Sequence, residues 1–496
     1  MRPHLMFPDR DFDFGQDQPY GSADLARDLA VDTVIEAMAD GDAFVSEVCS
    51  TALLCRTGAT DVVVYRQGVQ RDLEQLPDLA AELYGVAGDA LAKERNERYG
   101  MIGHSAEVIL GRAARVLDQL TSSFRDLREL AGRYRSSVAS TALAGFFDQV
   151  AAELSEDYLR ELTADLRELD FPHGVEVTVR LGPGDVGTDY RLARAPAHHE
   201  GVLDRLRGRT EPSFTVTVPD YDDAGARILS SLRGRAITQM ARVVADAAAD
   251  VLGFFETLQA EAGFYLGCCR LRHRLGALGL PTAIPDARPQ RDKALDATEL
   301  YDVSLALRLS GRVVGNDIHA DGTSLVVVTG ANQGGKSTFL RSVGLAQLML
   351  GAGMFIGARS GHLSTDAGLF THYRREEDPT MQHGKLDEEL ARMSAIADHL
   401  APGSLFLSNE SFAATNEREG SEIAEQILRA LRDSGIRTIF ITHLYELTHR
   451  LQRSEGPGVK FLRAERLEGG ERTYRLLEAP PLPTSYGTDL YDEIFG

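Results

Sequence analysis

One segment in the C-terminal half of the chain constrains its fold more than any other. Residues 325–329 read Leu-Val-Val-Val-Thr, an apolar run that is typical of a strand buried on both faces of a parallel sheet. A glycine-rich loop follows, and then an amphipathic pattern that predicts a helix from Phe339 to about Leu350. The loop consists of Gly330, Ala331, Asn332, Gln333, Gly334, Gly335, Lys336, Ser337 and Thr338. Its G-x-x-x-x-G-K-S pattern, between a strand and a helix, is that of a phosphate-binding loop.

Each part of this loop suits a nucleoside triphosphate. Glycines let backbone N–H groups surround the phosphates, and the N-terminus of the following helix adds positive potential. Lys336 is expected to reach the β- and γ-phosphates, and the Ser337 hydroxyl to coordinate Mg²⁺. The sequence therefore predicts ATP and Mg²⁺ as cofactors. A chance match in a glycine-rich loop is the alternative, but the flanking patterns argue against it.

A second apolar strand is predicted at residues 405–407, and it leads into Ser408, Asn409, Glu410 and Ser411. In an ATP-hydrolysing site, an Asp-Glu pair is expected at the end of this strand. Glu410 is well placed to polarise the attacking water. Asn409 occupies the position of the metal-binding Asp, where its amide oxygen brings no negative charge. We therefore expect weak Mg²⁺ binding or slow turnover. The alternative is a core strand without a catalytic role.

A third strand is predicted at residues 438–442 and ends at His443. The C-terminal ends of parallel strands border the crevice in which such sheets bind ligands. We interpret His443 as a sensor of the γ-phosphate, with a purely structural histidine as the alternative. Glu410 and His443 are thus the candidate catalytic residues.

The first half of the chain predicts mostly helix. Apolar residues from 110 to 131 recur at spacings of three and four, and a second long helix is predicted from about 224 to 275. Alternating patterns predict a small β-rich insertion at about 173–220, and an apolar run predicts a short strand at 61–65. Prolines at 281, 285 and 289 mark a boundary before the α/β pattern begins.

Charge excludes nucleic-acid binding by bulk electrostatics. The 496 residues include 53 Lys or Arg and 74 Asp or Glu, which gives a net charge of −21. Residues 224–280 carry seven Arg against four acidic residues, a local excess of +3. If the protein contacts DNA, we therefore expect the contact to lie in this segment. The candidates are Arg233, Arg235 and Arg242, although a solvated helix face explains the pattern as easily.

Neither a membrane span nor a signal peptide is expected. No uncharged apolar run approaches the roughly 20 residues that a membrane-spanning helix needs. The N-terminal residues 1–14 have no apolar stretch of the signal-peptide kind. We therefore expect a cytoplasmic protein that does not associate with membranes.

Together the motifs resemble the ATPase domain of the MutS family of DNA mismatch-repair proteins. The phosphate loop, with Asn332 and its double glycine, is similar to the family's loop, and the last 200 or so residues follow the family closely. Further matches are residues 366–371, Glu410, Thr415, Glu419, Gly420, residues 442–447 and residues 485–487. The resemblance implies an α/β P-loop ATPase domain of the ABC type at 286–496. It also implies a mainly helical core and lever domain at 1–285, similar in architecture only, which includes the β-rich insertion.

The sequence also departs from the family. The N-terminal mismatch-recognition domain and the C-terminal dimerisation tail are expected to be lacking. Residues 254–256 match the family's Phe-x-Glu wedge, but they lie in an apolar helical pattern and are interpreted as core packing. The family's signature serine aligns at Gly384-Lys385, so Lys385 is a candidate for contacting the nucleotide of a partner subunit. A surface lysine in a charged loop is the alternative.

Two functions follow as hypotheses. The first is a MutS-like ATPase acting on DNA in repair or recombination. It is expected to work as a homodimeric clamp or conformational switch that recognises DNA structure rather than sequence. The second is an ATP-dependent interaction or scaffold protein that does not read DNA, which the acidic balance and Asn409 favour.

Overall fold

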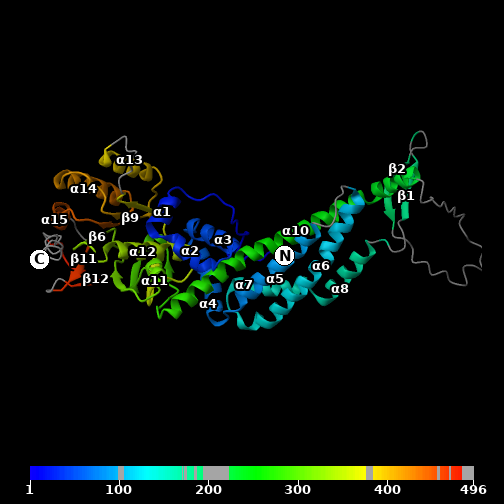
Figure 1. Cartoon of the computed structure of the whole chain (residues 1–496), viewed down its shortest axis with the longest axis horizontal. Coiled ribbons are helices and arrows are strands. Elements are labelled where there is room, and N and C mark those ends of the chain that lie inside the picture. Colours follow the sequence, from blue (N-terminus) through cyan, green and yellow to red (C-terminus); the bar gives the residue numbers. More distant parts are fainter. Residues whose placement is uncertain are drawn as a thin grey trace, which may run out of the picture. The chain divides into compact units, whose positions relative to one another are not determined.

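The structure is a computed structural model that describes residues 1–98, 105–169, 171, 176–181, 183, 187–193, 223–375, 384–454, 458–467 and 471–482. The chain divides into two compact units, each combining segments that are far apart in sequence (Figure 1). The first, called the helical unit below, contains Met1–Arg2, Gly85–Arg135 and Phe147–Gln259. The second, called the sheet unit, contains Pro3–Tyr84, Ser136–Phe146 and Ala260–Gly496.

Long helices form most of the helical unit. They are α5 (Leu79–Arg98), α6 (Ala106–Tyr134), α7 (Thr141–Glu153), α8 (Glu156–Glu168) and α10 (Asp223–Ala277), with a 3-10 turn, η1, at Arg135–Ser137. The first residues of α5 and α7 and the last residues of α10 belong to the sheet unit. The two long helices predicted from the sequence are therefore confirmed as α6 and α10. The side chains of Leu110, Leu120 and Leu127, which belong to the predicted stripe, are buried on α6. Phe254 and Phe255 are buried on α10, which confirms their interpretation as core.

A two-stranded hairpin lies within the range predicted to be β-rich. Strands β1 (Glu176–Leu181) and β2 (Gly187–Ala193) pair antiparallel. The second alternating pattern, near residues 214–218, lies outside the described residues.

The strand predicted at residues 61–65 is wrong. These residues belong to helix α4 (Thr60–Gln75), in which Val62, Val63 and Arg66 are buried while Val64 is 47% exposed. Buried positions recur with the helical period along the whole of α4. The helix therefore packs through a surface that extends well beyond the short apolar run. Tertiary packing thus outweighs the strand preference of three consecutive valines.

Helix α12 (Lys336–Gly351) follows the glycine-rich loop and is enclosed by other helices. It contacts α1 (Ser22–Leu29), α3 (Ala43–Leu54) and α11 (Val303–Leu309), while α2 (Val31–Ala39) packs against α1, α3 and α11. The fully buried Arg66 donates hydrogen bonds to the carbonyl oxygens of Met6 and Ala352, at 2.9 and 3.3 Å. The end of α12 is thereby joined to α4 and to the N-terminal segment.

A six-stranded sheet forms the centre of the sheet unit. In spatial order it contains β12 (Arg472–Glu478), β11 (Val459–Arg466), β6 (Leu325–Thr329), β10 (Arg437–Ile441), β9 (Leu405–Asn409) and β8 (Leu369–Tyr373). The strands from β11 to β8 are parallel, and β12 is antiparallel to β11. All five residues of β6 are buried, as its apolar run predicts.

Helices cover this sheet. Apolar side chains of α13 (Lys385–Ala397), α14 (Glu417–Asp433) and α15 (Tyr445–Ser454) form one core with Val327, Phe406 and Phe440 of the sheet. Helix α12 contacts β8, β9 and β10. The C-terminal half of the chain therefore has the α/β organisation that its strand and helix patterns predict.

A second, four-stranded sheet accompanies it. Its spatial order is β3 (Asp286–Arg288), β7 (Ser360–Ser364), β4 (Leu295–Leu300) and β5 (Asn316–His319), with a 3-10 turn, η3, at Gln290–Asp292. Gln347 of α12 donates hydrogen bonds to the Ser364 carbonyl oxygen and to the carboxylate of Asp366, both at 2.8 Å. These bonds connect the helix of the glycine-rich loop to the end of β7. Within the described ranges, every helix is too short or too polar to cross a membrane.

Candidate functional site

The predicted site residues meet at the C-terminal edge of the six-stranded sheet. Strand β10 lies between β6 and β9, and Ile441 pairs with Val328 on one side and Asn409 on the other. Because the three strands are parallel, the loops that follow them leave the sheet side by side. The Thr442 N–H donates to the Val328 carbonyl oxygen and the Glu410 N–H donates to that of Ile441, which fixes the three loops against one another.

Close packing against β11 explains two glycines of the phosphate-loop sequence. A Cβ on Gly330 or on Gly334 would lie 2.8 Å from the Cβ of Ala464. Gly330 also has a φ of 119°, a conformation that other residues rarely adopt. These glycines therefore let the loop pass directly over β11. Helix α12 begins at Lys336, three residues earlier than predicted, because Gly335 takes the N-cap position with a φ of 89°.

Lys336 is held inside its own loop. Its side chain is 4% exposed, and Nζ donates hydrogen bonds to the carbonyl oxygens of Gly330 and Ala331 at 3.0 and 2.8 Å. Burial lowers the pKa of Lys336 to about 8, although the nearby carboxylate of Glu410 acts in the opposite direction. An ammonium group held only by carbonyl oxygens can exchange them for phosphate oxygens, which carry more negative charge.

The side-chain oxygen atoms of Ser337 and Asn409 lie next to each other. The Ser337 hydroxyl donates a hydrogen bond to Asn409 Oδ1 at 3.1 Å. Oxygen ligands suit Mg²⁺, and adjacent ligands of its octahedral shell are separated by roughly 3 Å. The pair therefore fits the ion in type and spacing. Both ligands are neutral, so their attraction for the ion is weaker than that of a carboxylate.

Replacing Asn409 with Asp is expected to strengthen Mg²⁺ binding. One added unit charge near a divalent ion is worth up to a few kcal/mol in a partly exposed site, so the Mg²⁺ concentration for half-maximal nucleotide binding should fall about tenfold or more. The Ser337 hydroxyl can donate to Asp as it does to Asn. The measurement is a Mg²⁺ titration of fluorescent ATP-analogue binding.

Asn416→Asp is the matched control for that titration. Asn416 caps α14 by accepting the Glu419 N–H, which Asp also does, so the variant adds the same charge outside the Ser337–Asn409 pair. Equal Mg²⁺ dependence in the wild type and Asn409→Asp would contradict metal ligation at Asn409.

Glu410 and His443 form a direct pair. His443 Nε2 lies 2.8 Å from Glu410 Oε1, and both side chains are half-buried. The hydrogen bond from His443 holds the pKa of the Glu410 carboxyl below its usual range despite partial burial, and the charge of Lys336 acts in the same direction. Glu410 is therefore ionised at neutral pH and able to accept a proton. The backbone of Glu410 has a φ of 55°, which is unfavourable for a non-glycine residue. Contacts with the surrounding loop are therefore needed to support this conformation.

That support comes from a buried polar cluster that the sequence did not reveal. Ser411 Oγ lies 2.6 Å from Nδ1 of His372, and Ser408 Oγ donates to Ser411 Oγ at 2.7 Å. The His372 ring stacks on that of Phe412, and burial lowers its pKa to about 4, so the ring is neutral. The cluster holds the residue directly after Glu410. The only sequence signal was a histidine at the end of β8.

The other candidates lie elsewhere. Lys385 is the first residue of α13, and no hydrogen bond or ion pair between described residues joins it to the loop at 330–335. Arg233, Arg235 and Arg242 all belong to α10 in the helical unit. Arg242 is exposed, whereas the side chains of the other two lie outside the described part of the structure.

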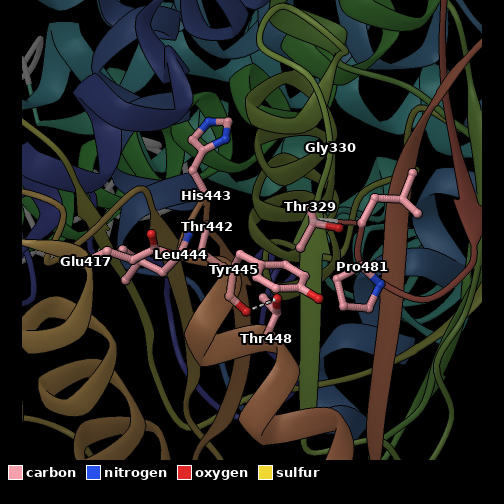
Figure 2. Close-up of a pocket in the computed structure, with 10 residues that line it drawn as sticks. Thr329, Gly330, Glu417, Thr442, His443, Leu444, Tyr445, Thr448 and Pro481 are labelled. Atoms are coloured by element: carbon pink, nitrogen blue, oxygen red, sulfur yellow. Dashed lines mark hydrogen bonds between the residues drawn. The ribbon is translucent and has the colours of Figure 1, made fainter. Parts of the chain in front are cut away.

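A cavity of about 170 Å³ opens beside Gly330 and His443 (Figure 2). Its walls come from the ends of β6 and β10, the first turns of α14 and α15, and the segment after β12. The lining residues are Thr329, Gly330, Glu417, Thr442, His443, Leu444, Tyr445, Thr448, Pro481 and Leu482. Three threonines make this lining largely polar, so it suits a polar ligand group next to the phosphate-loop sequence.

Comparison with known proteins gives the family. Two family models match the chain: the MutS2 N-terminal domain over residues 58–278 and MutS domain V over residues 326–489. Both describe parts of MutS-type proteins, and domain V covers the whole site described above. The chain belongs to the MutS family. The resemblance inferred from its motifs is confirmed.

The curated relatives are much longer than this chain. The DNA mismatch repair protein MutS of Chloroflexus aurantiacus is 31% identical over 183 residues, which cover 34% of this chain and 19% of the relative. MutS of Leptospira interrogans is 27% identical over 302 residues, or 58% of this chain and 34% of the relative. The chain thus spans about a third or less of the length of these relatives.

Proposed function

We propose that this protein binds ATP with Mg²⁺ at the C-terminal edge of the six-stranded sheet and hydrolyses it slowly. One observation carries the proposal. The phosphate-loop sequence and the residues after β9 and β10 lie together, with Ser337 hydrogen-bonded to Asn409 and Glu410 to His443. Membership of the MutS family and the match to domain V support the same conclusion.

Each residue has a role in this proposal. Lys336 exchanges the carbonyl oxygens of its loop for the β- and γ-phosphate oxygens, and the loop N–H groups bind the remaining phosphate charge. Ser337 and Asn409 would hold Mg²⁺, which would neutralise phosphate charge. Glu410 orients the attacking water and accepts its proton. His443 fixes the rotamer of Glu410 and keeps it ionised.

We further propose that ATP acts as a switch for binding DNA. The named relatives are DNA mismatch repair proteins, and the expected mode of binding is recognition of DNA by its structure rather than by its sequence. In a homodimer, Lys385 at the start of α13 would contribute positive charge to the partner's nucleotide. Arg233, Arg235 and Arg242 on α10 are the proposed DNA contacts.

Steady-state ATP hydrolysis at low salt tests this proposal. The reaction is measured without DNA and with single-stranded, duplex, mismatched and branched DNA, and Lys336→Ala provides the blank. Stimulation several-fold by one class of DNA, absent in Lys336→Ala, is the expected result. A rate that no DNA changes would contradict the DNA-coupled switch.

An ATP-dependent scaffold is the second candidate function, and the neutral Asn409 favours it. A metal site without a carboxylate suits ATP binding better than rapid turnover. In this case ATP changes the oligomeric state or the affinity for a protein without any effect of DNA. The same assay distinguishes the two functions.

A further inference from the structure

Aspartate and histidine alternate across the four-stranded sheet. His362 of β7 pairs with Asp286 of β3 on one side and with Asp296 of β4 on the other, and Asp296 pairs in turn with His319 of β5. Directly paired residues of neighbouring strands point to the same face of a sheet. The four side chains therefore form one row, called the Asp/His row below.

The Asp/His row lies on the polar face of this sheet. Ala287, Leu295, Ala297 and Leu363 occupy the alternate positions of the same strands, and all four are buried. Since successive residues of a strand point to opposite faces, the row points away from that core. Side chains on this face remain accessible to a dissolved ion.

A third aspartate, Asp321, joins the row from the turn after β5. Asp321 Oδ1 accepts the Leu295 N–H at 2.8 Å, which fixes the carboxylate, and Oδ2 lies 2.7 Å from His362 Nε2. On the other side, Asp296 Oδ2 lies 2.6 Å from His319 Nδ1. Asp296 and Asp321 thus place two carboxylates next to the imidazoles of His319 and His362.

We propose that Asp296, Asp321 and His362 bind a divalent transition-metal ion of the Zn²⁺ class. One ligand atom from each residue lies within 4.8 Å of the other two, whereas ligand atoms around tetrahedral zinc are roughly 3.4 Å apart. Small side-chain rotations close that difference. No other group of three or more such residues with this spacing occurs in the described part of the chain.

The ligand types favour zinc, cobalt or manganese over magnesium. An imidazole nitrogen combined with carboxylate oxygens suits first-row transition metals, whereas Mg²⁺ prefers oxygen ligands alone. His319 is placed as a positioning residue, because its bond to Asp296 orients that carboxylate as outer partners of metal ligands do.

Neighbouring cations limit the affinity. Arg437 donates to the carbonyl oxygens of Ala294 and Ala320, and Lys460 donates to that of His319. These positive charges partly offset the two carboxylates, so we expect micromolar rather than nanomolar binding. None of the ligands belongs to the nucleotide site, so this site is independent of the proposed ATPase function.

Cobalt and zinc titrations of the untagged full chain test the proposal. The protein is stripped with a chelator and titrated with Co²⁺ in the absence of nucleotide, and bound metal is followed by visible absorption and calorimetry. One Co²⁺ per chain, displaced by Zn²⁺, is the expected result. Saturating Zn²⁺ should also raise the unfolding midpoint by several degrees, since a ligand of the folded state stabilises it.

Substitutions identify the ligands. His362→Gln keeps a side-chain N–H for Asp321 but removes the imidazole, and Asp296→Asn removes one charge with little change of shape. Each should weaken Co²⁺ binding at least tenfold, and His319→Ala about tenfold. His273→Ala, an exposed histidine on α10, should bind as the wild type does. Absence of stoichiometric binding, or wild-type binding by both ligand variants, would overturn the proposal.

Discussion

Replacing Lys336 with Met is expected to lower the affinity for ATP by about 100-fold or more. The ammonium group is expected to make at least two charge-assisted hydrogen bonds to phosphate oxygens, together worth about 3 kcal/mol or more. Methionine has a similar length but no charge. Equilibrium binding of a fluorescent ATP analogue in the presence of Mg²⁺ measures the difference. Tight binding by Lys336→Met would exclude the loop at 330–335 as the phosphate site.

The same variant should fold at least as well as the wild type, which separates lost binding from lost structure. Burial lowers the pKa of Lys336 from its ordinary value of 10.5 to about 8, so the unfolded chain binds more protons between these limits. Wild-type stability therefore rises as pH increases from about 8 to 10.5, and the cost of the buried charge is fully present below pH 8. Lys336→Met should lose this rise. Urea unfolding at pH 7 and pH 9.5 measures it.

ATP binding should also depend on this titration. Phosphate charge favours the ammonium form, so binding above pH 8 takes up a proton and the affinity falls as pH rises further. Calorimetry at pH 8.5 in two buffers with different ionisation enthalpies detects the proton. Lys336→Ala offers a second, shorter variant in which this proton uptake should also be absent.

Local sequence patterns predicted the parts of the site but not their support. The run at residues 325–329, the glycine-rich loop and the strand before Asn409 each follow from patterns within a dozen residues. The contacts Ser337–Asn409 and Glu410–His443 need β10 to lie between β6 and β9, an order that the structure supplies. By contrast, the valines at 62–64 led to an incorrect strand prediction. The helical pattern of buried residues in α4 becomes visible only over a much longer stretch of the chain.

Features that depend on strand order were not predictable from the sequence. The contact of His372 with Ser411 needs β8 to lie next to β9, and the requirement for glycine at 330 and 334 comes from Ala464 on β11. The Asp/His row spans residues 286–362 and requires the spatial order β3-β7-β4-β5, in which no two neighbours are consecutive except β4 and β5. No local pattern encodes such an order.

Replacing Glu410 with Gln is expected to retain ATP binding and to lower the hydrolysis rate by about 100- to 10,000-fold, the usual contribution of a general base. Glutamine has the same shape and can still accept a hydrogen bond from His443, so the strained loop should keep its conformation. Single-turnover hydrolysis of prebound ATP separates this chemical step from binding. Glu422→Gln, which neutralises an exposed carboxylate on α14, is the matched control and should hydrolyse ATP at the wild-type rate.

The variant His443→Ala tests whether His443 positions Glu410 for the reaction or only stabilises the structure. Because the hydrogen bond from His443 lowers the pKa of Glu410, its removal should raise that pKa. Glu410 acts as a base only when ionised, so activity is lost as pH falls through its pKa, and in the variant this loss should begin at a higher pH. If His443 had only a structural role, the rate would fall with no shift of the pH profile.

A Glu410→Gln protein that hydrolyses ATP normally would instead remove Glu410 from the reaction, and the base would have to be sought elsewhere at this edge of the sheet.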